Sequence, residues 1–155
     1  MNTSKLEYRI QNSEFSMTFR KTGKGYIIRM FKGEKVIETL TKFCEKENIQ
    51  GAYFHGLGAV SEAEFGYYDL SKKEYAFTKY NNMMEVVSMT GNVALFKGDT
   101  ILHVHGIFSD TENRTLGGHI KEATVGVTVE VHVTDCEERI ERKYDEEIGL
   151  NLLEI

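Results

Sequence analysis

The stretch "VGVTVEVHV", residues 125–133, places a valine at every second position. Because neighbouring side chains of a β-strand point to opposite faces of the sheet, this period of two predicts a strand with one apolar face. The face expected in the core holds Val125, Val127, Val129, Val131 and Val133. The opposite face holds Gly126, Thr128, Glu130 and His132. The fold class then depends on what surrounds this strand.

Further segments with the pattern of a β-strand precede it in the sequence. Alternating or β-branched patterns separated by turn residues occur in "GYIIRMFKGE" (25–34), "GAYFHGLGAV" (51–60), "AEFGYYDL" (63–70), "KEYAFTKY" (73–80), "MEVVSMTGNVALF" (84–96) and "ILHVHGIF" (101–108). Consecutive short strands with turn signals between them are typical of an antiparallel sheet. The pattern therefore predicts a mainly antiparallel sheet that curls towards a barrel.

One segment has the period of a helix instead. "EKVIETLTKFCEKENI", residues 34–49, repeats apolar side chains along one helical face and fills the other face with acids and lysines. The apolar stripe comprises Val36, Ile37, Leu40, Phe43 and Cys44. One helix packed on a curled antiparallel sheet defines an α+β fold.

Composition and length limit the classes of function. A chain of 155 residues forms one domain, residues 1–155, whose core we expect at about 15–153. The net charge of −5 does not favour a nucleic-acid backbone, which attracts basic surfaces. No apolar run is long enough to span a bilayer, and the start "MNTSKLEYRI" lacks the apolar segment of a secretion signal. We therefore expect a cytoplasmic protein.

Three of the five histidines fall within "LHVHGIFSDTENRTLGGHI", residues 102–120. On a strand, His103 and His105 project from the same face, which is the arrangement of a two-ligand clamp for a metal ion. The glycine pair before His119 would let the backbone turn sharply and return this third imidazole to the strand. Three histidines without a fourth protein ligand are typical of an open, catalytic-type zinc site.

The alternative is that the paired histidines only form hydrogen bonds or face solvent. Metal identity also stays open, because imidazole ligands suit zinc and other divalent transition metals alike. Glu130 is a candidate for a further metal ligand, for a hydrogen-bond partner that fixes an imidazole tautomer, or for a general base; its simpler role is that of a half-exposed acid paired with a lysine. His132 lies on the same face of its strand as Glu130, and His55, in "YFHGLGAV", is expected to be structural.

Cysteine chemistry is not supported: Cys44 lies on the helix's apolar stripe, and Cys136 lies among acids.

The order of four motifs carries a family resemblance. "MEVVSMTGNVALF", "LHVHGIFSD", "GGHI" and "VTVEVHV", together with "GLGAV" and "FGYYD", resemble the plant-and-prokaryote-conserved (PPC) domain family from Tyr26 to about Leu153. This family is also known as a domain of unknown function, and many bacterial members bear the name DNA-binding protein. The resemblance implies an antiparallel sheet with one helix, assembled as a homotrimer. It also implies a metal site, with zinc as the ion, at His103, His105 and His119.

This chain differs from the plant members of the family in two features that concern DNA targeting and partner binding. The plant relatives carry a proline-containing AT-hook, whereas this chain contains no proline. The plant Gly-Arg-Phe-Glu-Ile-Leu segment corresponds to residues 82–87, where Met83 replaces the arginine. The fold is also similar, at a distance, to acetolactate decarboxylase, a zinc enzyme, although a shared fold does not carry function with it.

Three functions remain in competition at this point. The first is a trimeric metal-binding domain that acts on a small carbonyl or carboxylate ligand, with Glu130 handling protons. The second is a DNA-associated regulator, which "RIERKYDEE" supports poorly, because acids interrupt its basic residues and indicate a solvated edge. The third is an interaction module with a structural metal, in which the methionines of "NNMMEVVSM" serve either as interface or as core.

Overall fold

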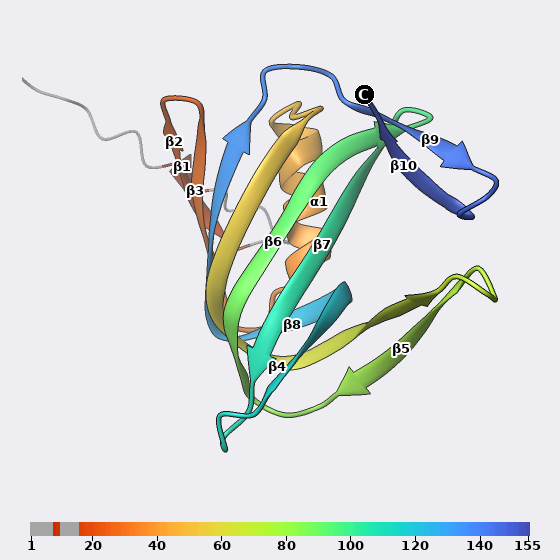
Figure 1. The fold of residues 1–155 in the computed structure, drawn as a ribbon. Helices are drawn as coiled ribbons and strands as arrows, with labels where there is room; N and C mark the ends of the chain where they lie inside the picture. The colour runs from red at the N-terminus through yellow and green to blue at the C-terminus, as the bar shows by residue number, and fades with distance from the viewer. Residues whose placement is uncertain (1–7, 10–15) are drawn as a thin grey trace, which may run out of the picture.

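The computed structural model describes residues 8–9 and 16–155, and it shows the expected α+β fold (Figure 1). The segment in which we looked for a secretion signal lies outside the described residues, apart from Tyr8–Arg9. One helix and ten strands follow in the order β1 (Tyr8–Arg9), β2 (Thr18–Thr22), β3 (Gly25–Phe31), α1 (Val36–Lys46), β4 (Ala52–Asp69), β5 (Glu74–Tyr80), β6 (Met84–Phe96), β7 (Asp99–Ser109), β8 (Thr115–Asp135), β9 (Glu141–Asp145) and β10 (Leu150–Glu154).

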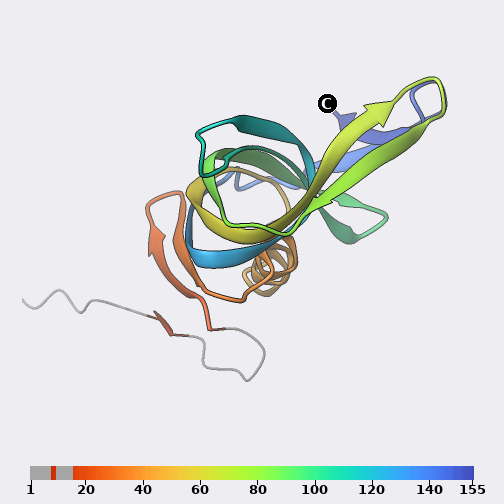
Figure 2. The same cartoon turned by 90° about the horizontal axis from the view of Figure 1, so that it is seen from below.

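The centre of the sheet closes on itself. β8 pairs with β4, β4 with β6, β6 with β7, and β7 again with β8, each time antiparallel. Figure 2, seen from below, shows these strands curling into a closed loop. β3 extends the sheet on the other side of β8, and one parallel contact between Leu95 and Glu141 joins β9 to β6. The sheet is therefore curled and mainly antiparallel, as its pattern predicted.

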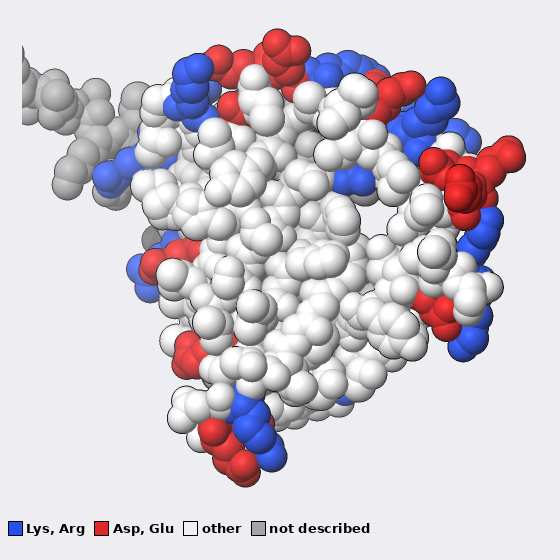
Figure 3. Space-filling view, in the orientation of Figure 1, with Lys and Arg blue, Asp and Glu red and all other residues white. Residues whose placement is uncertain are grey.

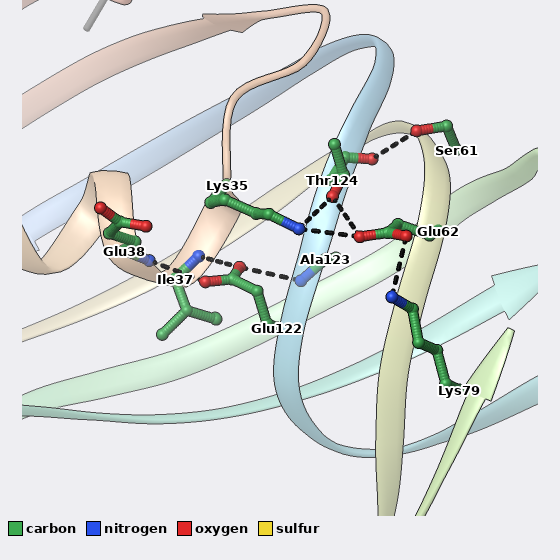
Figure 4. Close-up of polar contacts among 9 residues, drawn as sticks. All are labelled: Lys35, Ile37, Glu38, Ser61, Glu62, Lys79, Glu122, Ala123 and Thr124. Carbon is green, nitrogen blue, oxygen red and sulfur yellow. Dashed lines mark hydrogen bonds and ion pairs between the residues drawn. The ribbon is translucent and has the colours of Figure 1, made fainter. Parts of the chain in front are cut away.

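The helix packs its apolar stripe against β7 and β8. Val36, Leu40, Phe43 and Cys44 are buried, as their spacing predicted. Lys35 at the N-cap forms no capping hydrogen bond with its side chain. The carboxylate of Glu122 on β8 accepts the backbone N–H groups at 37 and 38 instead, at 2.8 and 3.2 Å (Figure 4). A strand thus supplies the acceptors that the first turn of a helix needs.

The sequence predicted two separate strands within residues 51–70, and this prediction is wrong. Ala52–Asp69 forms the single strand β4. Its pairing with β8 shifts register between Gly58 and Val60, and again between Val60 and Glu62 and between Glu64 and Phe65. Such bulges bend a strand without ending it, so one strand can follow the curl. Opposite the first shift, Val127 is 62% exposed, whereas Val125 and Val129 are fully buried. The expectation that Val127 faces the core is therefore wrong, because the bulge interrupts the period of two.

The outward face of the sheet is poor in charge. In Figure 3 acidic and basic side chains gather along the rim of the face that carries β4, β6 and β7, and few lie at its centre. Large apolar side chains are exposed on neighbouring strands, among them Ile27 on β3, Leu57 on β4 and Val127 on β8. In the segment 81–89, Met84 and Met89 are buried, as expected for methionines that fill the core, whereas Met83 is exposed.

Candidate metal centre

Strand β7 carries the first two histidines on its outward face. Val104 between them is buried, while His103 and His105 point away from the core. Their cross-strand neighbours on β6 are Asn92 and Thr90, which share that face. The alternation in "LHVHG" thus places both imidazoles side by side, as its spacing predicted.

The β7–β8 hairpin brings in the third histidine. The carboxylate of Asp110 accepts the backbone N–H groups of Glu112 and Arg114 and the side-chain Nε–H of Arg114, which holds the turn. The returning strand β8 pairs with β7 so that His119 lies directly opposite His105. The tight turn therefore lies at residues 110–114 and ends before the glycine pair begins at Gly117.

The glycine pair has another role than the sharp turn expected from the sequence. Gly117 and Gly118 lie inside β8 and form regular pairs. A Cβ at Gly117 would stand 2.4 Å from the carbonyl oxygen of Gly106 on β7, and one at Gly118 would stand 2.4 Å from that of Gly66 on β4. The glycines let three strands approach closely at this point, which fixes the position of His119.

The three imidazoles converge. One nitrogen from each of His103, His105 and His119 can be chosen so that all lie within 4.8 Å of one another. The Nε2 atoms of His103 and His105 are 3.1 Å apart, and the Nδ1 of His119 is buried without a hydrogen-bond partner. Two nitrogens bound to one zinc ion at about 2.1 Å in tetrahedral geometry lie about 3.4 Å apart. Small side-chain rotations would therefore bring all three onto one ion, and the donor set fits a transition metal.

Burial favours the neutral form of two of these rings, His119 and His103. Burial lowers the pKa of His119 from 6.5 to about 4, helped by the charges of His103 and His105. Burial also lowers the pKa of His103, with smaller contributions from His105 and Arg142. A neutral imidazole keeps the lone pair that a metal ion needs, so at pH 7 these two nitrogens are ready to bind.

Two aromatic rings on β5 cover the third histidine. The ring of Tyr75 stacks on His119 with 4.4 Å between centroids, and the ring of Phe77 lies 6.2 Å away. Sequence reasoning did not assign β5 to the site, because nothing in "KEYAFTKY" reveals which strand it will face. The alternation of Tyr75 and Phe77 was the only signal, and it indicates a shared face without identifying the neighbour.

Arg142 on β9 was also missed. Its segment was expected to be a solvated edge, yet this side chain is only 9% exposed, so the expectation is wrong at this position. Its Nη2 donates to the side-chain oxygen of Asn92, the cross-strand neighbour of His103. Charged residues on either side of Arg142 gave no hint that this one alone would be buried.

The remaining candidate residues lie elsewhere. Glu130 is exposed on β8 between Leu57 of β4 and Arg29 of β3. β4 and β6 separate this part of β8 from β7, so at about 4.8 Å per strand the carboxylate lies roughly 14 Å from the histidines. His55 and His132 are exposed and stack on each other with 5.1 Å between centroids. The structure does not bring these three side chains to the metal centre.

The cysteines are both free. Cys44 is buried in the helix stripe, and burial raises the pKa of its thiol to about 12, with smaller contributions from Asp135 and Glu45. A thiol with so high a pKa stays protonated at neutral pH and is a poor nucleophile. Cys136 is exposed. Neither residue competes with the histidines as a reactive centre.

Comparison with known families identifies the family to which this chain belongs. The model of the Plants and Prokaryotes Conserved (PCC) domain matches residues 17–137, well over half of the chain. The chain therefore belongs to this family, as the order of its motifs indicated. No curated protein matches the sequence. Among the described residues, no helix combines the length and the apolar character of a membrane span.

Solved structures show the same fold. A putative DNA-binding protein from Ralstonia eutropha JMP134 is 36% identical, with a TM-score of 0.84 over 88% of this chain and 95% of that chain. A metal-containing protein from Archaeoglobus fulgidus is 30% identical, with a TM-score of 0.79 over 87% of this chain and 96% of that chain. The α-acetolactate decarboxylase of Bacillus subtilis strain 168 shares only the fold, at 11% identity and a TM-score of 0.55 over 86% of this chain and 62% of that chain.

Proposed function

We propose that the protein binds one divalent transition-metal ion, with zinc as the native ion, through His103, His105 and His119. The observation that carries the proposal is the convergence of three imidazole nitrogens from two paired strands. The Nδ1 of His119 is also buried without a hydrogen-bond partner, which is costly, and an ion bound at this nitrogen would satisfy it. The similarity to the Archaeoglobus protein, which is described as metal-containing, supports the same conclusion.

The chain's own residues shape the centre. Three protein ligands leave room for a further ligand, and a zinc ion so bound supplies Lewis acidity towards a carbonyl or carboxylate oxygen. Tyr75 and Phe77 cover His119 and restrict the access of water. Small carbonyl or carboxylate compounds are therefore the ligand class that we propose. We give Glu130 no part in the centre, because β4 and β6 lie between it and the histidines.

Elemental analysis of native, untagged protein tests the proposal. We expect close to one zinc ion per chain in the wild type and none retained by His119→Ala after dialysis. His132→Ala is the matched control, because it removes an exposed imidazole from the same strand and should keep the metal. A metal-free wild type that takes up no zinc when it is offered, or equal metal contents in the two variants, would rule out the centre.

We further propose that the chain assembles as a homotrimer through the outward face of its sheet. Exposed apolar side chains of this extent mark interaction surfaces, and Leu57, Val127 and Ile27 supply them here. Figure 3 shows that charged side chains surround this face and leave its centre uncharged, as at an interface core. Glu130 lies on this face beside Leu57, where it would form part of the subunit contact.

The mass in solution tests the assembly. Light scattering should give three times the chain mass of 17.7 kDa. Leu57→Asp places a charge in the apolar face and should release monomers, whereas Leu70→Asp, in the turn that follows β4, changes an exposed residue and should leave the trimer intact. A monomeric wild type would refute this assembly, as would a Leu57→Asp protein with the mass of a trimer.

A further inference from the structure

Arg142 is a buried cation held by neutral groups. Among the described residues, it and Thr39 are the only buried polar side chains. Its Nη1 donates to the backbone oxygen of Asn151 at 2.9 Å, and its Nη2 donates to the side-chain oxygen of Asn92. Neither acceptor carries a charge, so the positive charge of the guanidinium is not neutralised by these contacts.

No acid balances this charge. No Asp or Glu within residues 16–155 forms an ion pair with Arg142, and its buried Nε has no hydrogen-bond partner. Burial lowers the pKa of Arg142, but an arginine stays protonated at neutral pH. Buried charges in folded proteins are paired or bind an ion, because removing a lone charge from water costs several kcal/mol. Among residues 16–155 the guanidinium therefore has no negatively charged partner in an ion pair.

The guanidinium lies at the edge of the metal centre. Its acceptor Asn92 is the cross-strand neighbour of His103, and such neighbours have Cβ atoms about 5 Å apart. Burial and His105 lower the pKa of His103, and the charge of Arg142 adds to this effect. Burial raises the pKa of Tyr75, which stacks on His119, and the charge of Arg142 opposes this rise. Arg142 therefore borders the histidines from β9, on the side where Tyr75 covers them.

Two hairpins enclose this region. The Tyr68 hydroxyl donates to the backbone oxygen of Ile148, and the Lys73 ammonium donates to that of Glu146, so the β4–β5 hairpin is tied to the β9–β10 turn. Figure 3 shows an opening between these hairpins and the body of the molecule, with a basic side chain at its edge. This opening lies between β7, the strand of His103 and His105, and the β9–β10 hairpin, which carries Arg142 (Figures 1 and 3).

We propose that Arg142 binds the carboxylate group of the site's ligand, which makes that ligand a small organic monoanion. The inference rests on the proposed function, because the rest of the ligand would occupy the free position of the metal centre. The planar guanidinium uses Nη1 and Nη2 in one hydrogen bond each, and the remaining Nη hydrogens suit the two oxygens of a carboxylate. One buried cation balances one negative charge, and the rings of Tyr75 and Phe77 suit an organic body rather than a phosphate ion.

Isothermal titration calorimetry with pyruvate and methyl pyruvate tests the inference. Both probes offer a carbonyl oxygen, but only pyruvate carries a negative charge. Zinc-loaded wild type in chloride-free buffer should bind pyruvate at least about tenfold more tightly than the ester, the size expected for a charged hydrogen bond. Arg142→Met should lose this preference. Lys143→Met removes the next cation on β9, an exposed one, and should keep it.

Zinc content, measured on the same samples, distinguishes a failure of the proposed metal centre from a failure of the proposed carboxylate site at Arg142. Arg142→Met should keep zinc at the wild-type level, which a variant with a collapsed site would not do. Wild type that holds zinc but binds the acid and the ester equally, or binds inorganic phosphate and no pyruvate, overturns the role of Arg142 and leaves the metal centre standing. Wild type without zinc that still prefers pyruvate, with the preference lost in Arg142→Met, supports the anion site and disproves the metal centre. If Arg142→Met does not fold, the comparison of the two probes on zinc-free wild type decides, because bound zinc would itself attract a carboxylate: a preference for pyruvate supports Arg142, and equal binding overturns it.

Discussion

The burial of His119 affects both the stability of the fold and the proposed binding of a metal ion. Its pKa falls from 6.5 to about 4 on folding, mainly because the ring is buried. The unfolded chain therefore binds more protons than the folded chain between about pH 6.5 and pH 4, and stability must fall as the pH falls through this range. The same shift keeps the ring neutral, and ready for a metal ion, at pH 7.

Metal-free protein should show this pH dependence directly. With a chelator present, we expect the melting temperature to fall as the pH is lowered from about 6.5 to about 4. His119→Gln, which does not titrate in this range, should flatten the curve. His55→Gln serves as the control, because its exposed ring should leave the slope unchanged. Equal slopes in all three proteins would contradict a neutral, buried His119.

The helix α1 depends on a carboxylate from another element. Glu122 on β8 accepts the N–H groups of Ile37 and Glu38, and lies beside the network of Lys35, Glu62 and Thr124 (Figure 4). Glu122→Ala should lower the free energy of unfolding by about 1–2 kcal/mol, the usual effect of losing an N-terminal cap. Urea denaturation measures the difference. Glu64→Ala removes an exposed partner of Lys121 and should cost less than about 1 kcal/mol.

Strand β8 depends on its glycines. Gly118→Ala would place a methyl group 2.4 Å from the backbone oxygen of Gly66, and a paired strand cannot easily move away. We expect a loss of about 1–3 kcal/mol of stability together with weaker metal binding, because His119 follows directly on the displaced backbone. Gly23→Ala meets no atom within 4 Å and should leave both quantities unchanged. A Gly118→Ala protein with wild-type stability would contradict the close strand contact.

Local patterns predict single elements better than their arrangement. The apolar stripe of α1 and the shared face of His103 and His105 followed directly from their periods of 3.6 and 2. The exposure of Val127 could not be predicted, because it depends on a bulge set by pairing with β4. The roles of Tyr75 and Arg142 depend on contacts with β8 and β6, strands distant in the sequence. Side chains brought together by sheet pairing leave little trace in a single sequence.

At the scale of the whole molecule, the net charge is a test of DNA binding, the property after which some similar proteins are named. The protein has a net charge of −5, and Figure 3 shows no continuous basic stripe on the face that it draws. We expect a gel shift with duplex DNA at physiological salt to show no complex at protein concentrations below about 10 µM. Micromolar or tighter binding that weakens steeply with added salt would contradict this expectation and favour the DNA-associated function.

Anomalous X-ray scattering at the zinc absorption edge is the most direct test of the proposed metal centre. Crystals of the protein grown with zinc should show one strong anomalous peak per chain, about 2.0–2.1 Å from a nitrogen of each of His103, His105 and His119. A peak at the stacked pair of His55 and His132 instead, or none near β7, would show that the three imidazoles converge for another reason.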